Sequence, residues 1–528
     1  MNWFLIIVAI VMTVMLMIGS LYVLVYFQAE EDKNTAWAPK IAVVLGLTLA
    51  CCVVLLLPMD VANRSTGSGL DMEGLYQAVY MIIAIMILGV LPYLIFYYEA
   101  ENPEGRNYQC WTAVKYEALT VLISLTVVVI MWVFLGKADV PLTEYVFNST
   151  ESERSSAAAH GLLSADDSCA SPDACGLPAD LRAGLPLVLR VSVTPVVYLM
   201  AMISFVGWFF FVLFGGIGLA AMPMDLLVGF TKRPQPIDVQ EYAKQKLLLN
   251  ERAQKLLLIA GQLGDDASRA RDRKTQKLCA APRNSAAQFG RAILRDSAAH
   301  FSDGSSTHRR RYRQFKQAVY FLEKDWQKVQ VAYKERGGNP LKHFGFLLLG
   351  VISAILSLCW LIHIVLYIFI RQPAPASQFL NEYFMLLDNA LPLLGTATYA
   401  IFAFYLLFCV LKGNLKFGLR FFLIPIHPMR VGNTMMNSFL FNVLLLLLCA
   451  VSAVQFCATA FATYARLTAV DMLFGVQVRN LIFLQYFFRH DVFIYLIVGV
   501  MAMTGLYLGV FPTDKRALDD ADDDAPPM

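Results

Sequence analysis

The sequence is short of charge. Only 16% of its 528 residues are Asp, Glu, Lys or Arg, whereas an ordinary soluble domain has about 25%. Hydrophobic residues make up 58% of the chain and aromatic residues 12%. This composition excludes a soluble enzyme with an apolar patch and predicts an all-α polytopic membrane protein.

The sequence also lacks the common catalytic signatures. It contains no His-Glu-x-x-His, no phosphate-binding Gly-x-x-x-x-Gly-Lys-Ser/Thr and no Gly-x-Ser-x-Gly. The apolar segments have almost no charge away from their ends, although proton or ion relays inside a membrane require buried ionisable groups. Glu117 and Asp388 lie near segment starts, and His363 is isolated among apolar residues, which is typical of a packing residue. We therefore expect no enzyme, no cofactor and no nucleic-acid partner.

The ten cysteines show no pattern of metal ligands. Most lie inside apolar segments, where cysteine behaves as a small hydrophobic residue. Cys169 and Cys175 are six residues apart in a segment rich in Ser, Pro and Asp, and the orientation derived below places them outside. This spacing favours a small disulfide loop over two free thiols. Zinc is disfavoured because His160 is the only histidine nearby, whereas a structural zinc usually has four ligands.

Nine apolar segments are long enough to cross a bilayer, which requires roughly 20 residues of helix. We expect spans at about 3–27, 40–58, 75–98, 113–135, 193–222, 344–370, 386–411, 435–463 and 491–511. The first span lacks the basic start and the cleavage site of a secretory signal, so it is interpreted as a permanent helix.

A basic segment at 223–343 separates the first five spans from the last four. It holds 24 Lys and Arg against 12 Asp and Glu, whereas the whole chain has a net charge of only +3. Cytoplasmic loops are enriched in Lys and Arg, so the segment is predicted to lie in the cytosol. With the N-terminus outside, the inner loops contain 34 of the 43 basic residues. Without the basic segment, the inner loops hold 10 basic residues and the outer loops 9, which favours neither orientation.

Two glycosylation sequons support the same orientation. Sequons are modified only on the lumenal or extracellular side. Those at Asn63 and Asn148 both fall in loops that this orientation places outside. Asn148 is the better acceptor, because Asn63 follows the second span closely.

The basic segment divides into two helical arms and a linker. Apolar residues recur at alternating spacings of three and four, as in a coiled coil. The predicted seam includes Tyr242, Leu249, Leu256 and Leu263 in the first arm and Phe315, Leu322, Trp326 and Val329 in the second. Residues 264–311 have no sustained periodic pattern of apolar residues, which predicts a flexible linker. We expect an antiparallel cytosolic hairpin, which either packs only against itself or also binds a partner.

A short motif occurs twice. Pro58, Met59 and Asp60 end the second predicted span, and Pro223, Met224 and Asp225 end the fifth. Proline followed by a polar residue commonly ends a helix, so both copies are interpreted as helix-exit turns. Similar turns at opposite faces are also a feature of inverted repeats in transporters.

These motifs resemble a known family. The Leu-Pro-Met-Asp exit after the second span, Leu91–Glu99 and Gly218–Leu226 are similar to the limb-region and lipocalin-receptor family of nine-span membrane proteins. The helical insertion after the fifth span and the acidic run 519–524 resemble its lysosomal cobalamin-escort branch. The resemblance covers nearly the whole chain in layout.

The resemblance implies a non-enzymatic receptor, escort or adaptor that helps a small ligand, such as cobalamin, to be trafficked or exported. It implies an ABC transporter or a cytosolic trafficking protein as partner, besides membrane lipids, in a lysosomal, endosomal or plasma membrane. The alternatives are a secondary transporter of a small neutral ligand and a membrane signalling scaffold. The expected organisation has a membrane region at 1–222 with an outside loop at 136–192, the cytosolic segment 223–343, a second membrane region at 344–511 and an acidic cytosolic tail at 512–528.

Overall fold

The computed structural model describes thirteen stretches of the chain: 3–29, 32, 37–66, 69–100, 106–143, 186–231, 237–269, 306–334, 340–370, 377–417, 419–421, 424–426 and 434–510. The chain forms two compact units. The first comprises Met1–Met222 and Ile355–Gly505, and the second comprises Pro223–Ala354 and Leu506–Met528. The predicted tail at 512–528 lies outside the described residues.

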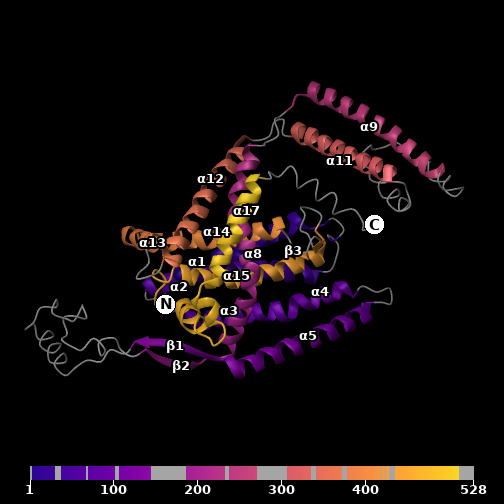
Figure 1. Cartoon of the computed structure of the whole chain (residues 1–528). Coiled ribbons are helices and arrows are strands. Elements are labelled where there is room, and N and C mark those ends of the chain that lie inside the picture. Colours follow the sequence, from indigo (N-terminus) through magenta and orange to yellow (C-terminus); the bar gives the residue numbers. More distant parts are fainter. Residues whose placement is uncertain are drawn as a thin grey trace, which may run out of the picture. The chain divides into compact units, whose positions relative to one another are not determined.

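Nine helices in the described residues are long and apolar enough to cross a membrane, as the sequence predicts. Figure 1 labels the helices that form them, and two of the spans combine several elements. They are α1 (Trp3–Phe27), α2 (Trp37–Thr66), the combination of α3 (Met72–Ile85), η2 (Met86–Val90) and α4 (Leu91–Glu99), α5 (Arg106–Leu135), α8 (Pro195–Thr231), the combination of α12 (Pro340–His363) and η5 (Ile364–Phe369), α14 (Leu394–Phe417), α15 (Met436–Ala460) and α17 (Val492–Val510).

The core of the first unit surrounds α15. In the apolar window of α15, 83% of the residues are buried, and in that of α2, 67% are buried. These two helices pack together. The corresponding window of α5 has no buried residue, and that of α1 is 6% buried. Large apolar side chains such as Leu122 and Phe134 are therefore exposed along α5. In a bilayer this surface contacts lipid, so its exposure has no hydrophobic cost.

The seventh span begins later than the sequence predicts. Residues 386–390 were expected in the span, but they belong to a separate helix, α13 (Phe379–Ala390). The chain breaks at Pro392: Leu391 before it is extended, and Leu393 after it has a φ of 70°. Proline disfavours helical geometry in the preceding residue, which explains the break. Asp388 then accepts hydrogen bonds from the Gly395 and Thr396 amides and caps the start of α14.

Short strands accompany the helices. Strand β1 (Lys137–Thr143) pairs antiparallel with β2 (Pro186–Ser192), with Lys137 opposite Ser192. Strands β3 (Leu419–Phe421) and β4 (Ile424–Ile426) form a second pair. Between α15 and α17 the chain forms the π-helix η6 (Asp471–Val478) and the short helix α16 (Gln485–Arg489). The ends of the predicted outside loop 136–192 are thus a paired β-ribbon.

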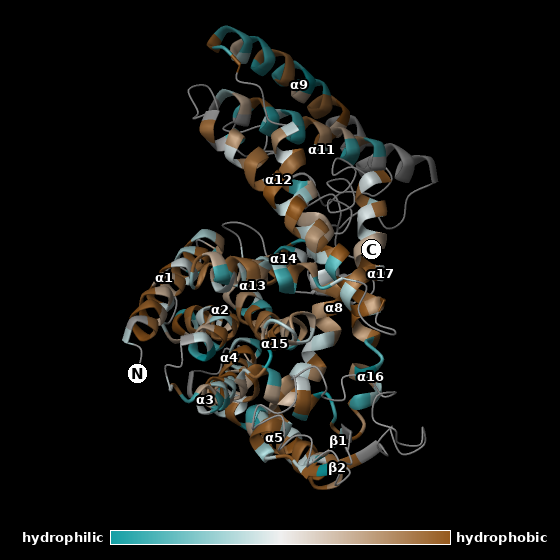
Figure 2. Ribbon diagram, turned by 90° about the vertical axis from the view of Figure 1, so that its left-hand side faces the viewer, coloured by the Kyte–Doolittle hydropathy of each residue, from teal (hydrophilic) through white to brown (hydrophobic). Residues whose placement is uncertain are grey.

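Two long helices of the second unit are not among the candidate spans. They are α9 (Val239–Arg269) and α11 (Ser306–Lys334). Both carry hydrophilic residues along their length (Figure 2). Helix therefore occupies both ends of the predicted 264–311 linker, whereas residues 270–305 lie outside the described residues.

Candidate functional site

A buried polar cluster joins α8 to α15 in the first unit. The side-chain carbonyl of Gln455 accepts hydrogen bonds from Trp208 Nε1, at 2.9 Å, and from the Ser204 hydroxyl. The Ser452 hydroxyl donates to the Ser204 carbonyl at 2.8 Å. A Cβ on Gly207 would lie 2.1 Å from the Leu448 carbonyl, so glycine permits the close approach of the two backbones. These contacts hold Gln455 in a fixed orientation.

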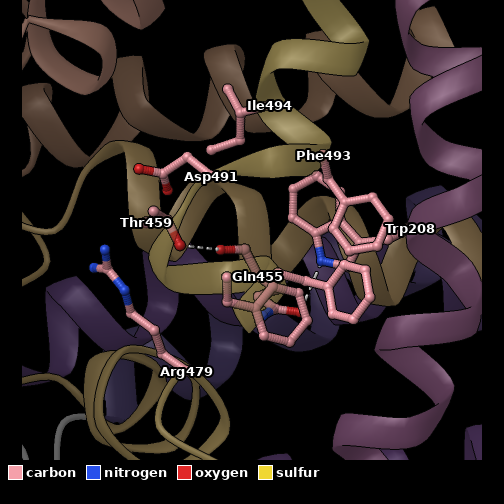
Figure 3. A pocket seen from close by; sticks show the side chains of 9 residues that line it. Trp208, Gln455, Thr459, Arg479, Asp491, Phe493 and Ile494 are labelled. Atoms are coloured by element: carbon pink, nitrogen blue, oxygen red, sulfur yellow. Dashed lines mark hydrogen bonds between the residues drawn. The ribbon is translucent and has the colours of Figure 1, made fainter. Parts of the chain in front are cut away.

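A pocket lies beside this cluster (Figure 3). Its space is about 300 Å³, which includes open solvent. Its walls are aromatic, and the rings of Trp208 and Phe493 stack with centroids 5.3 Å apart. The lining residues are Trp208, Gln455, Thr459, Arg479, Phe487, Phe488, Asp491, Phe493 and Ile494. The cavity within this space is only about 10 Å³, which is enough for about one water molecule, whereas typical small-molecule sites are about 300 to 1,000 Å³.

The pocket offers no evident metal centre. Within the described ranges, no three His, Cys, Asp or Glu side chains gather closely enough to hold a metal ion. Arg479 and Asp491 bring opposite charges to one end of the pocket, and Gln455 and Thr459 bring neutral polar groups. In this conformation the cavity beside these groups has room for about one water molecule.

The helix-exit interpretation of the two proline motifs is wrong. Pro58 lies inside α2, which continues to Thr66, and Pro223 lies inside α8, which continues to Thr231. A proline inside a helix leaves the carbonyl four residues earlier without its usual amide donor. For Pro223 that carbonyl belongs to Leu219, and it accepts a hydrogen bond of 2.7 Å from the Ser357 hydroxyl of α12. A neighbouring helix therefore replaces the missing donor.

The aspartates of the two motifs have different environments. Asp60 is 2% exposed, and its carboxylate accepts a hydrogen bond of 2.8 Å from the Val470 amide. Asp225 is half-buried. Met59 and Met224, which precede them, are also half-buried. Asp60 thus connects α2 to the segment that follows α15.

Tyr464 forms a second connection close to Asp60. Its hydroxyl donates to Asp388, and its amide donates to Asn381 Oδ1 at 3.2 Å. The Arg64 guanidinium donates to the Tyr464 carbonyl at 3.4 Å. Burial, together with the hydrogen bond to Asp388, raises the pKa of the Tyr464 hydroxyl above its ordinary value. The hydroxyl therefore remains a neutral donor at physiological pH.

The predicted seam residues bring α9 and α11 together. The rings of Tyr242 and Tyr333 stack with centroids 4.2 Å apart, and Trp326 lies 6.5 Å from Tyr242. Further along, Arg252 and Asp325 form an ion pair at 3.7 Å. The early part of α9 therefore faces the late part of α11. Leu249, Phe315 and Val329 are buried, whereas Leu256 and Leu322 are half-buried. Coiled-coil geometry stays a prediction, and the side chain of Leu263 lies outside the described residues.

Helix α9 also has an apolar surface that no seam residue covers. We define the outer leucine face as Leu247, Leu248, Leu258 and Ile259. Leu247 is 64% exposed and Leu258 is 70% exposed, and these two residues are eleven positions apart, which places them on one side of a helix. Sequence reasoning missed this surface because it assigned partner binding to the seam.

The predicted modification sites fall mostly outside the described residues. This applies to Asn148, Cys169 and Cys175. Asn63 is described: it lies in the last turn of α2, and its amide donates to the Leu70 carbonyl at 3.1 Å. Its side chain is therefore engaged within the protein.

Nine apolar helices and lipid-facing surfaces along α1 and α5 define a multi-pass helical membrane protein. Residues 5–504 match the LMBR1-like membrane protein family, so the chain belongs to this family. A LIMR family protein of Dictyostelium discoideum is 35% identical, with 98% of this chain and 99% of that protein covered. LIMR family proteins of Oryza sativa subsp. japonica and Arabidopsis thaliana are 33% and 32% identical and cover 98% and 97% of this chain. Those two alignments include 97% and 96% of the relatives' own lengths. No solved structure matches the chain.

Sequence reasoning did not find the pocket. Its residues come from α8, α15, α17 and the segment between the last two helices. The first of them, Trp208, and the last, Ile494, are more than 280 positions apart in the chain. One local signal was available: the run Phe487–Phe493 combines three phenylalanines with Arg489, His490 and Asp491. Aromatic and charged residues are common at the ends of membrane spans, so this run by itself did not indicate a pocket.

Proposed function

We propose that this protein is a non-enzymatic membrane receptor or escort, which helps a partner membrane protein to traffic or export a small ligand. Cobalamin is the candidate ligand, and an ABC transporter or a cytosolic trafficking protein is the candidate partner. The proposed setting is a lysosomal, endosomal or plasma membrane, with the N-terminus outside and the C-terminus in the cytosol. The observation that carries the proposal is the outer leucine face of α9.

The outer leucine face suits a protein partner. Contiguous exposed apolar side chains on a segment outside the membrane commonly mark an interaction site. The paired helices together are basic, because α11 carries eight Lys and Arg against two Asp and Glu, whereas α9 carries five against four. We therefore propose an amphipathic partner surface with acidic residues around an apolar centre. Binding of α9 to anionic lipid is the competing outcome.

The size of the pocket supports an escort over a carrier of cobalamin. Its cavity of about 10 Å³ holds about one water molecule. Cobalamin is far larger, so the pocket in this conformation cannot enclose it. The second candidate function, secondary transport of a small neutral ligand, is favoured instead by the scarcity of charge in the spans, since a neutral ligand needs no buried ionisable group.

Liposomes containing the purified protein test whether it moves cobalamin by itself. The escort proposal expects no movement of labelled cobalamin, because the protein by itself provides no route for it. Protein-free liposomes set the background leak. Flux above that leak without any partner would contradict the escort proposal and favour the carrier.

The docking surface is tested with a double substitution, Leu247→Asp with Leu258→Asp. Full burial of one leucine is worth about 1.5–3 kcal/mol, so removal of both should weaken capture of the ABC transporter at least tenfold. The matched control is Asn250→Asp with Gln254→Asp, which adds the same charge to exposed positions of α9 and keeps both leucines. Capture is measured by co-purification from native membranes. Equal loss in both proteins would assign the effect to charge and reject the leucine face, and retained capture in both would also reject it.

A further inference from the structure

Several buried polar atoms in the first unit have no hydrogen-bond partner among the described residues. Four of them are the hydroxyls of Tyr76 and Tyr80 on α3, the hydroxyl of Tyr399 on α14 and the side-chain nitrogen of Asn381 on α13. The four residues are 0%, 1%, 0% and 0% exposed.

Two of these hydroxyls lie near Asp60. Tyr76 and Tyr399 are each within electrostatic range of the Asp60 carboxylate, and Tyr76 is also within range of Tyr399. The ring of Tyr80 is 6.3 Å from that of Tyr76. The ring of Tyr399 is 5.6 Å from that of Tyr464, whose backbone amide donates to Asn381. The four groups are thus linked to Asp60, either directly or through neighbouring residues.

Leaving these groups unpaired would be costly. A buried polar group without a hydrogen bond loses its hydration without replacement, which destabilises the folded protein, and native proteins leave few such groups unpaired. Phenylalanine would fill the same space without the penalty. Three tyrosines at such positions therefore indicate a partner that is not part of the chain.

The surroundings of Asp60 indicate which hydrogen-bonding groups that partner must carry. Its carboxylate accepts from the backbone amides of Val470 and Ala469, and within the described residues no Lys or Arg forms an ion pair with it. The site thus offers a carboxylate that accepts, an amide that donates and three hydroxyls that can do either. A hydroxyl-bearing neutral molecule matches all of them, because its oxygen both donates and accepts. Water is the smallest such molecule.

We propose that Asp60, Tyr76, Tyr80, Tyr399 and Asn381 form a buried binding site for small neutral hydroxyl-bearing molecules, with ordered water as the resident ligand. Buried waters typically make about three hydrogen bonds to such groups. The site joins α2, α3, α13 and α14, and it shares no lining residue with the pocket of Figure 3. It does not depend on the proposed escort function.

The test replaces one hydroxyl at a time in the full-length protein. Tyr399→Phe and Tyr76→Phe keep the ring and remove only the group that contacts the ligand. If a ligand bonds the hydroxyl, each substitution should lower the melting temperature in detergent by about 2 °C or more. Tyr383→Phe, at an exposed position of α13, is the control and should leave it unchanged. An unchanged or higher melting temperature for both buried variants would show a dry site and overturn the proposal.

A second arm distinguishes water from a larger polyol. The melting temperatures of wild type and Tyr399→Phe are compared with and without glycerol. A resident water predicts the same difference in both buffers, whereas a polyol in the site predicts a larger difference with glycerol. A cryo-electron microscopy map is the independent measurement. Density within hydrogen-bond distance of at least three of the four groups supports the site, and a well-resolved map without such density overturns it.

Discussion

At the scale of single residues, Pro223 and Ser357 act as a pair across two helices. Proline removes an amide from α8, and the Ser357 hydroxyl takes its place at the Leu219 carbonyl. The same hydroxyl also contacts Tyr405 on α14. The motif that resembled a helix end therefore creates an acceptor in the middle of a helix, and a neighbouring helix recognises it.

Ser357→Ala should destabilise the protein by about 1–3 kcal/mol, because the Leu219 carbonyl becomes a buried acceptor without a donor. The melting temperature in detergent measures the loss. Thr231→Ala on α8 is the control, since the Thr231 hydroxyl bonds within its own helix to the Leu227 carbonyl.

A double substitution identifies the mechanism. Pro223→Ala restores the amide, so the cost of Ser357→Ala should shrink in that background. An equal cost in both backgrounds would instead assign the role of Ser357 to its contact with Tyr405.

Tyr464 provides a prediction about pH. Its pKa is raised, so stability from this group is complete below the pKa of an unfolded tyrosine, about 10, and decreases as pH rises above it. Tyr464→Phe should therefore lower the melting temperature at pH 7, and the gap to wild type should narrow above pH 10. Unfolding scans of both proteins from pH 7 to 10.5 measure the gap. A gap that widened with pH would contradict the assignment.

At the scale of helices and strands, hydropathy predicted all nine spans because roughly 20 apolar residues are a strong signal. It did not predict where they end. Pro58 and Pro223 were taken as ends, but packing against neighbouring helices continues both helices past the proline. The strand pair β1 and β2 was missed because the partners are separated by 42 residues in the chain. Contacts such as Asp60 with Val470 depend on tertiary structure and leave no local pattern.

Helix α8 contains a direct test of close packing. A Cβ on Gly218 would lie 1.7 Å from the Cys409 carbonyl of α14, whereas one on Gly229 of the same helix would meet no atom within 4 Å. Gly218→Ala should force the helices apart and cost about 1–3 kcal/mol or more. Gly229→Ala should leave stability unchanged or raise it by up to about 1 kcal/mol, because alanine favours helix. The yield of folded protein and its melting temperature distinguish the two. Similar losses in both variants would argue against the close contact.

At the scale of the whole molecule, the orientation remains a prediction that glycosylation can test. With the N-terminus outside, Asn148→Gln should remove one glycan, seen as a faster-migrating band that enzymatic deglycosylation no longer changes. Asn63→Gln should change nothing, because Asn63 lies in α2 and bonds Leu70. A wild-type protein that carries no glycan would contradict the outside placement of Asn148. Cleavage of the 264–311 segment only from the lumenal side would reverse the whole orientation.

The contact between Asp60 and Val470 has a consequence for biosynthesis. The two residues are 410 positions apart, so the ribosome, at about 5–20 residues per second, needs roughly 20–80 s to make the second after the first. Helix α15, the most buried span, also emerges late. During this interval the early spans reside in the membrane with a carboxylate that has not yet met its amide donor. The nascent chain thus has a long window in which an insertase or a membrane chaperone must shield α2, and truncations before α15 should be cleared by quality control rather than accumulate.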